Sequence, residues 1–432
     1  MNKAFEVKEF DSIICNPDYK DDHNYKYLDK KEFDKLVTFI HEFATSENNE
    51  DILKFMKIGY KRHLGEVISI RNYVGLIQLE DGFQIQILPK IMLCNREEEN
   101  NQITKKIFIK MLRSMKDFPS KVFNYASLKV DKMNLYELFI NMYLQEVRHL
   151  VNKGLQSAYI NREDNLKYYK GKLVSNKNMK LNLVHKERFY VSYEEFHTNR
   201  PENRLIKSTL LKLQKLTNSF HNSKEIRQLL SVFENVSQSF NYVKDFNKVI
   251  IDRNTQNYKM LMHWSKVFLM NKSFSTFSGT TNSRALLFPM ESVYESFVAQ
   301  KMKEFMGANG WNVSNQDKGK FLFIEPRKQF GLRPDIVMTK NDRTIILDTK
   351  WKVLFDNEHK NYGISQSDMY QMYAYSKKYE TSEIWLLYPI NSEMYNHSPI
   401  HFDSGDGATI KLHFIDLENI ESNLTDLRNK LT

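Results

Sequence analysis

The sequence predicts an α/β protein built from three successive regions, because the periodicity of its apolar residues changes twice along the chain. Residues 1–100 contain short runs rich in β-branched residues, which are typical of strands. Residues 101–283 carry apolar residues mainly at helical spacing. In residues 284–432, helical and strand patterns alternate, which predicts an α/β domain. A chain of 432 residues is long enough for two or three such domains.

The β-rich first region begins with a short helix, expected over Lys31–Phe43. Strands are expected at Glu66–Ile70, Tyr73–Leu79 and Phe83–Leu88, and Glu80–Gly82 supplies the turn between the last two. Nothing in this region predicts catalysis.

The second region is predicted to be mainly helical, with helices over Ile103–Met115 and Leu135–Leu155. A basic segment at residues 161–190 interrupts the helical pattern and predicts strands around a turn at Gly171. It holds eight Lys or Arg residues against three acids. Such a segment fits a contact with nucleic-acid phosphates or with a partner subunit, and equally a hairpin that is merely solvated.

The third region is expected to follow a boundary in the Ser- and Thr-rich segment 271–283. Before that boundary, Pro201 lies close to the first turn of another predicted helix. An amphipathic helix is expected over Glu291–Met306 and a strand over Phe321–Ile324. Ser365 and Asp368 have the spacing of a capping box before a helix at 366–379. The last central strand is expected at Ile384–Tyr388.

A β-hairpin is predicted at the centre of this third region. Two apolar runs, Ile336–Met338 and Ile345–Leu347, flank a polar tetrad of turn residues. A two-residue loop at 341–342 is a common hairpin connection and pairs Lys340 with Arg343.

This register places Asp335 opposite Asp348, so that two carboxylates converge on one face of the sheet. Side chains alternate along a strand, and Lys350 therefore joins them. Opposed carboxylates repel and require a cation. A hard ion such as Mg2+ takes one or two carboxylates and accepts phosphate oxygens. The pattern thus predicts a site for phosphodiester chemistry in which Lys350 orients or deprotonates a metal-bound water, or stabilises phosphate charge. The alternative is a buried Asp-Lys ion pair.

The string RPD at 333–335 and the string DTKWK at 348–352 together resemble the PD-(D/E)xK nuclease signature. The fuller string is more closely similar to McrC, the nuclease subunit of McrBC modification-dependent restriction systems, although Trp351 stands where that family usually has Tyr. RNYVGLIQLEDGFQIQILPK at 71–90 and NRPENRLIK at 199–207 also resemble McrC sequences.

The resemblance implies a C-terminal PD-(D/E)xK nuclease domain with a mixed central sheet flanked by helices. It implies that Glu295, on the first helix, completes a metal site with Asp335 and Asp348. Gln371 and Tyr375 are similar to a QxxxY helix that supports the active site or the DNA backbone in such nucleases. Bound Mg2+, for which Mn2+ can substitute, is expected to receive further help from the carbonyl of Thr349.

The resemblance also implies a function, that of a DNA endonuclease subunit in an antiviral restriction complex. An McrB-like AAA+ GTPase ring would recognise and translocate double-stranded DNA, and this chain would bind the ring, stimulate its GTP hydrolysis and cut. The N-terminal two thirds of the chain are then expected to dock on the partner, with the 161–190 segment as one candidate contact. Alternatives are a stand-alone repair or recombination nuclease, a cutting subunit directed at an unmodified sequence, and a non-catalytic scaffold of an NTPase.

Composition excludes several other classes of protein. The net charge of +10 favours a polyanionic partner only slightly. Cys15 and Cys94 form no paired motif, so no disulfide framework or zinc ribbon is expected. The absence of a signal sequence or a membrane-length apolar stretch predicts a cytoplasmic protein with no membrane contact. No P-loop motif is present, and the chain is not expected to bind a nucleotide itself.

Overall fold

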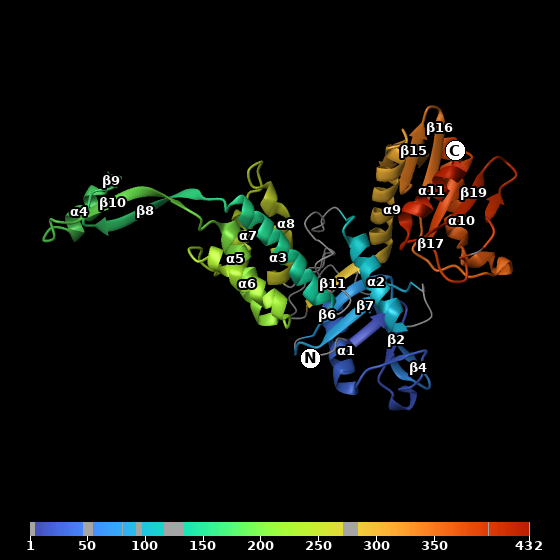
Figure 1. Ribbon diagram of the computed structural model, residues 1–432, viewed down its shortest axis with the longest axis horizontal. Coiled ribbons are helices and arrows are strands. Elements are labelled where there is room, and N and C mark those ends of the chain that lie inside the picture. Colours follow the sequence, from blue (N-terminus) through green and yellow to red (C-terminus); the bar gives the residue numbers. More distant parts are fainter. Residues whose placement is uncertain are drawn as a thin grey trace. The chain divides into compact units, whose positions relative to one another are not determined.

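The computed structural model describes residues 5–45, 55–79, 81–91, 97–115, 134–270, 284–395 and 397–431 (Figure 1). These residues form two compact units. One unit holds residues 136–270, and the other holds the described residues before 136 and after 283. The boundary predicted at 271–283 lies outside the described residues. Among the described helices, none is long and apolar enough to cross a membrane.

The second unit contains two small N-terminal sheets. Their strands are ordered β1-β7-β6-β11 and β3-β2-β5-β4. The bounds are Phe5–Lys8 for β1, Ser12–Ile14 for β2, Lys26–Tyr27 for β3, Met56–Lys61 for β4, Gly65–Ile70 for β5, Tyr73–Gln78 for β6, Gln84–Leu88 for β7 and Arg284–Pro289 for β11. Helix α1 (Lys30–Thr45) packs Phe33 and Leu36 into a core shared with Ile68 and Ile85 of the two sheets. Helix α2 spans Glu97–Leu112, and a 3-10 turn spans Pro17–Tyr19.

Strand β11 joins residues far apart in the sequence, because it pairs antiparallel with β6 of the N-terminal sheet. A Cβ added at Gly75 of β6 would lie 1.9 Å from the carbonyl oxygen of Leu286, so only glycine allows the two backbones to approach this closely. The residues after 283 thus begin within the N-terminal sheet, so the first and third predicted regions share one compact unit.

The first unit is a group of helices from which a β structure protrudes. The helices are α3 (Leu135–Lys153), α5 (Pro201–Leu216), α6 (Phe220–Val232), α7 (Tyr242–Lys248) and α8 (Gln256–Met270). Pro201 occupies the first turn of α5, as predicted. The buried rings of Phe139 and Trp264 lie 5.9 Å apart and connect α3 with α8. The hydroxyl groups of Tyr143 and Ser265 connect the same helices at 2.8 Å.

The protruding β structure, residues 158–197, is here called the long arm (Figure 1). Strand β8 (Ala158–Leu166) pairs antiparallel with β10 (Phe189–His197), which also pairs with the short β9 (Lys172–Leu173). The prediction of strands on both sides of Gly171 is wrong for part of this segment, because residues 175–181 form helix α4 (Ser175–Leu181). Asn182 ends this helix and exchanges two amide hydrogen bonds of 2.8 Å with Asn165 of β8.

The C-terminal part of the second unit is a six-stranded mixed sheet, ordered β12-β15-β16-β17-β19-β18. The strands are Asn312–Asn315, Ile336–Lys340, Arg343–Thr349, Glu383–Pro389, Thr409–Ile415 and His401–Asp403 in that order. Helix α10 (Gln366–Tyr379) buries Met372 and Tyr375 against Ile346 and Leu386 of the sheet. Helices α9 (Met290–Gly307) and α11 (Ile420–Leu431) contact the sheet and each other, and a 3-10 segment spans Glu358–Gly363.

The predicted hairpin register is confirmed, since Lys340 pairs with Arg343 and Ile336 pairs with Leu347. Asn341 adopts a φ of 53°, as a tight hairpin turn requires. The sequence predicted that β17 would be the last central strand. This prediction is wrong, because β19 pairs parallel with β17 and buries Ile410 and Leu412. Strands β13 (Phe321–Phe323) and β14 (Gln329–Gly331) form a separate two-stranded sheet.

Candidate active site

The end of the β15–β16 hairpin carries the predicted pair of aspartates and the predicted lysine. Asp348 is the penultimate residue of β16, and its side chain is buried. The Nζ atom of Lys350 lies 2.8 Å from Oδ2 of Asp348. Oδ2 of Asp335 accepts hydrogen bonds from the backbone N–H of Thr349 at 2.7 Å and from its hydroxyl at 2.5 Å. All four residues line a single cleft.

Helix α10 supplies a second layer of contacts around Lys350. Ser365 caps the helix by accepting a hydrogen bond from the N–H of Asp368, which confirms the predicted start. The amide oxygen of Gln371 lies 3.1 Å from the Lys350 ammonium, and the Gln371 amide donates to the Tyr375 hydroxyl at 2.8 Å. A carboxylate oxygen of Asp368 lies 3.6 Å from the same ammonium. Gln371 and Tyr375 therefore form a chain of contacts that ends at Lys350.

Two glutamates of helix α9 line the same cleft as the aspartates. Glu295 accepts a hydrogen bond of 2.8 Å from the side chain of Gln316, whose backbone N–H donates to the carbonyl of Asp335 at 2.8 Å. Glu291, one turn earlier, accepts a hydrogen bond of 2.9 Å from Asn72. Both glutamates are thus held at the cleft by polar neighbours outside the predicted set.

The electrostatics of the cleft follow from its burial and from the convergence of acids. Burial, followed by the charge of Asp335, raises the pKa of Asp348 to about 7. Burial also raises the pKa of Asp335, although the two hydrogen bonds from Thr349 act in the opposite direction. Burial alone would lower the pKa of Lys350, but the neighbouring carboxylates, Asp348 first, raise it. The neighbouring carboxylates therefore stabilise the charged ammonium form of Lys350.

The donor set fits a hard divalent cation such as Mg2+. Oδ2 of Asp348 is buried and lacks a well-aligned hydrogen bond, although it forms an ion pair with Lys350. Among the residues that the structure describes, no three Asp, Glu, His or Cys side chains stand together as a complete metal site. Two aspartates and the Thr349 carbonyl nevertheless suit Mg2+, which keeps several waters. Glu295 lines the same cleft, where its carboxylate accepts the hydrogen bond from Gln316.

A buried glutamate from the N-terminal sheet touches the residue after Lys350. Oε1 of Glu9 accepts hydrogen bonds of 2.8 Å from Nε1 of Trp351 and from the backbone N–H of Lys90. Burial raises the pKa of Glu9 to about 7. Trp351, where Tyr was the expected family residue, thus makes a polar contact as well as an apolar one.

Sequence reasoning missed Asp368 as a site residue, because it explained this aspartate only as a helix cap. Asp368, Gln371 and Tyr375 are spaced at i, i+3 and i+7, which places them on one helical face. That spacing is a signal that could have identified Asp368. Gln316 and Glu9 carry no comparable signal, since each reaches the site from an element far away in the sequence.

Comparisons with known proteins show the family of the chain. Residues 68–389 match the family described as McrBC 5-methylcytosine restriction system component. The chain belongs to this family. The match spans every residue named above as lining the cleft. Glu9, which contacts Trp351, lies outside the matched residues. The resemblance to McrC seen in the sequence is confirmed at this level.

Solved structures share the fold of this McrBC-family chain. One is a chain of a refined half-complex from a tetradecameric assembly of Thermococcus gammatolerans McrB AAA+ hexamers with bound McrC, with a TM-score of 0.70 and 18% identity. The match covers 98% of this chain and 100% of the chain in that structure. A second, from the cryo-EM structure of the Thermococcus gammatolerans McrBC complex, has a TM-score of 0.50 and 19% identity over 69% of this chain and 87% of its own. No curated protein matches.

Proposed function

We propose that this chain is the DNA endonuclease subunit of an McrBC-type restriction complex and that the cleft at the end of β16 cuts the phosphodiester. The observation that carries the proposal is the buried carboxylate of Asp348, which lies 2.8 Å from an ammonium and shares its cleft with Asp335. Burying like charges together destabilises a fold, and such arrangements occur mainly where chemistry requires them.

Asp335 and Asp348, together with the Thr349 carbonyl, would hold Mg2+ or Mn2+, with Glu295 as a further candidate. The bound ion would supply Lewis-acid stabilisation of the charge that develops on the phosphodiester. The hydrogen bonds from Thr349 fix one oxygen of Asp335 and leave its other oxygen for a ligand.

Lys350 acts as a protonated donor that orients the attacking water and stabilises negative charge on the phosphate. Gln371 accepts from this ammonium, and Tyr375 is hydrogen-bonded to Gln371 in turn. These two residues are therefore positioning residues that limit the movement of the lysine.

The partner proposed for the chain is an McrB-like AAA+ GTPase ring that recognises and translocates double-stranded DNA. The proposal is supported by the family match and by the fold shared with complexes that contain McrB AAA+ hexamers and McrC. This chain would bind the ring and stimulate its GTP hydrolysis. The N-terminal sheets and the long arm are the candidate contact surfaces.

The test is cleavage of methylated and unmethylated plasmid by the full chain with Mg2+, with and without the McrB-type partner and GTP. Asp348→Asn should abolish cleavage and retain stimulation of GTP hydrolysis. Asp342→Asn is the matched control, because it removes the same charge from the exposed turn of the same hairpin.

Each remaining outcome of this experiment selects one of the alternatives. Cleavage without partner or GTP would indicate a stand-alone nuclease. Partner-dependent cleavage of unmethylated plasmid alone would indicate a system for an unmodified sequence. GTPase stimulation without any cleavage would indicate a scaffold, and cleavage by Asp348→Asn at the wild-type rate would refute the assignment of the cleft.

A further inference from the structure

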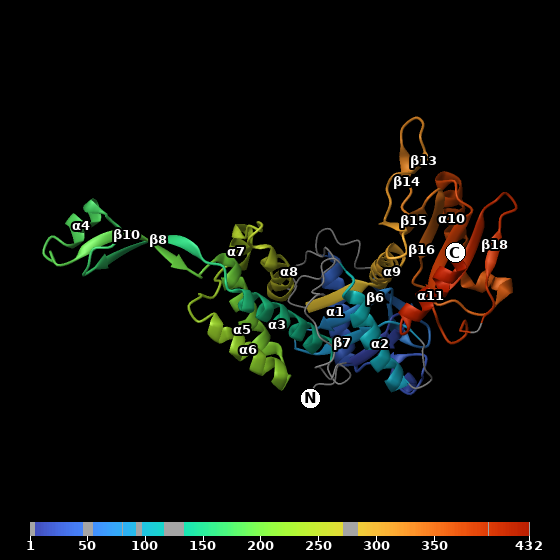
Figure 2. The same ribbon diagram turned by 45° about the horizontal axis from the view of Figure 1, so that its top comes forward.

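Residues 316–333 form a second protruding β structure, here called the short arm, which leads directly into Asp335. Strands β13 and β14 pair at its centre, and Figure 2 shows them projecting beyond the strands of the C-terminal sheet. Neither strand contributes to that sheet. The short arm is therefore an addition to the nuclease-like sheet rather than part of its core.

The base of the short arm is fixed to the candidate active site. Gln316 hydrogen-bonds to both Glu295 and the backbone of Asp335, each at 2.8 Å. The next residue, Asp317, accepts a hydrogen bond of 2.5 Å from the Tyr379 hydroxyl of helix α10. Whatever the tip of the arm binds is thus held at a defined distance from the two aspartates.

The tip of the short arm exposes large apolar side chains to solvent. Phe323, Ile324 and Phe330 are 54%, 66% and 69% exposed, and the two phenylalanine rings contact each other edge to face at 5.9 Å. Phe330 has a φ of 54°, a left-handed conformation that is unfavourable for a bulky residue. A strained backbone that presents an aromatic ring to water is typical of a binding surface.

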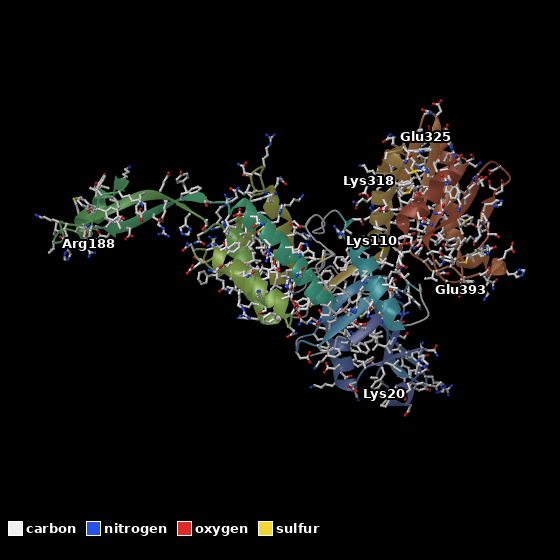
Figure 3. All side chains as sticks on the ribbon, viewed as in Figure 1. Lys20, Lys110, Arg188, Lys318, Glu325 and Glu393 are labelled. Carbon is white, nitrogen blue, oxygen red and sulfur yellow. The ribbon has the colours of Figure 1, made fainter. Side chains whose placement is uncertain are left out.

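Cationic side chains surround this apolar tip. Lys318, Lys320, Arg327 and Lys328 are all exposed, and none of them pairs with an acid within the described part of the chain. Lys328 instead lies over the ring of Phe321 at 5.7 Å. Of the two acids in the arm, Asp317 is bonded to Tyr379, and Glu325 lies at the tip (Figure 3).

We propose that the short arm binds the minor groove of duplex DNA beside the phosphodiester that is cut. Lysine and arginine contact the phosphates, and Phe323 and Phe330 form an apolar wedge against a base step. Minor-groove proteins combine these two kinds of side chain. The inference rests on the proposed nuclease function, because the arm's attachment to the two aspartates is what selects DNA over an acidic protein surface.

The geometry also limits which base pairs the short arm can reach. Phe330 lies five residues before Asp335, and Phe323 pairs with Gln329, so at a strand rise of about 3.3 Å per residue both rings leave the backbone within roughly 20 Å of Asp335. Base pairs are spaced about 3.4 Å apart along the duplex, and the wedge therefore falls within roughly one helical turn of the cut.

The test compares two variants of the short arm with two control variants on β4. Lys320→Gln with Lys328→Gln removes charge, and Phe323→Ser with Phe330→Gly removes the wedge, glycine being compatible with the left-handed backbone. Lys57→Gln with Lys61→Gln and the single change Tyr60→Ser alter exposed residues of the same kinds on β4. Thermal melting of every variant checks that the chain still folds.

Binding of a fluorescent duplex to the full chain is measured with Ca2+ in place of Mg2+. The wedge variant should bind about tenfold more weakly, as expected for loss of an aromatic contact to a base. The charge variant should lower the slope of log K against log salt by about 2, because each phosphate contact contributes about 0.9. Both β4 controls should bind as the wild type does.

Equal DNA binding by all variants would overturn the proposal. It would also be overturned if the arm variants lost only stimulation of the partner's GTPase, because the short arm would then contact the partner. The outcome is separable from that of the proposed function. Normal cleavage with an unchanged KM in the arm variants refutes the arm and leaves the nuclease standing. Weakened binding in a chain that never cuts refutes the nuclease and leaves the arm.

Discussion

The two β arms are both basic and aromatic, but only in the long arm do some of the cations pair with acids among the described residues. In the long arm, Arg162 pairs with Glu195 at 3.0 Å, and Lys177 pairs with Glu163. Lys170 lies over the ring of Tyr193 at 4.0 Å. In the short arm, the cations have no acidic partner within the described residues and stand beside exposed phenylalanines.

The difference shows that basic composition alone does not identify a surface that binds DNA. Lysines that pair within their own arm stabilise that arm and offer little free charge to a polyanion. Lysines without partners remain available to phosphates. Five other cations of the long arm are exposed and form no ion pair among the described residues, namely Lys167, Lys172, Lys180, Lys186 and Arg188. What distinguishes the short arm is its attachment to Glu295 and Asp335 through Gln316. We therefore propose the short arm for DNA and the long arm for a protein partner.

The largest expected effect separates the chemistry from both arms. Lys350→Gln should reduce cleavage by about 10²- to 10³-fold, because it removes the cationic donor while leaving both arms intact. Plasmid cleavage and duplex binding are measured together, and Lys340→Gln, on the same hairpin, serves as the control. Loss of DNA binding in parallel with cleavage would show that Lys350 contributes to binding instead.

A second change should break the long arm alone. A Cβ at Gly171 would lie 2.4 Å from the carbonyl oxygen of Ser192, whereas one at Gly154 meets nothing within 4 Å, and both glycines have positive φ. Gly171→Ala should therefore loosen β9 and β10 and reduce GTPase stimulation several-fold more than Gly154→Ala. Hydrogen exchange of β10 and the partner's GTPase rate measure this. Duplex binding that falls with Gly171→Ala would contradict the division of roles.

A pH-dependent change in the free energy of unfolding is expected from Glu9, which lies in the same unit as the short arm. Its pKa is about 7 in the folded chain against an ordinary value of 4.5. Because the folded state holds the proton more tightly, the contribution of Glu9 to stability is complete below pH 4.5 and is lost as pH rises through 7. This contribution is on the order of 3–4 kcal/mol.

Unfolding midpoints of the wild type and Glu9→Gln between pH 4.5 and 8 provide the measurement. The wild type should lose stability relative to Glu9→Gln as pH rises across this window. Parallel curves for the two proteins would mean that Glu9 is ionised at no cost in the fold.

The smallest expected effect concerns the helix beside the lysine. Tyr375→Phe removes the hydroxyl that accepts from Gln371 and should lower kcat by about two- to tenfold, the value of one hydrogen bond, with KM unchanged. Tyr373→Phe on the same helix is the control. A change in KM alone would place Tyr375 at the DNA instead of behind Lys350.

Local rules predicted much of the sheet and of the site. The two-residue turn fixed the register of β15 and β16, and this register brought Asp335, Asp348 and Lys350 to one cleft. Helix starts at Pro201 and Ser365 followed from their chemistry. Helix α4 could not be predicted in this way, because the hydrogen bonds between Asn182 and Asn165 that stabilise its end join residues on different elements.

Residues that approach the cleft from distant elements were beyond sequence reasoning. Gln316, Glu9 and Asn72 each reach the cleft or its edge through a contact with a partner far away in the chain. The pairing of β11 with β6 depends on a close approach at Gly75 that only the fold makes visible. The short arm looked like one ordinary strand because its second strand is only Gln329–Gly331.

The central claim is that a divalent cation binds between Asp335 and Asp348. Titration of Mn2+ into the full chain, followed by electron paramagnetic resonance, tests it most directly in the wild type, Asp335→Asn, Asp348→Asn and the turn control Asp342→Asn. The wild type and Asp342→Asn should bind Mn2+, and both cleft variants should lose this binding. Unchanged Mn2+ binding in Asp335→Asn and Asp348→Asn would contradict the claim.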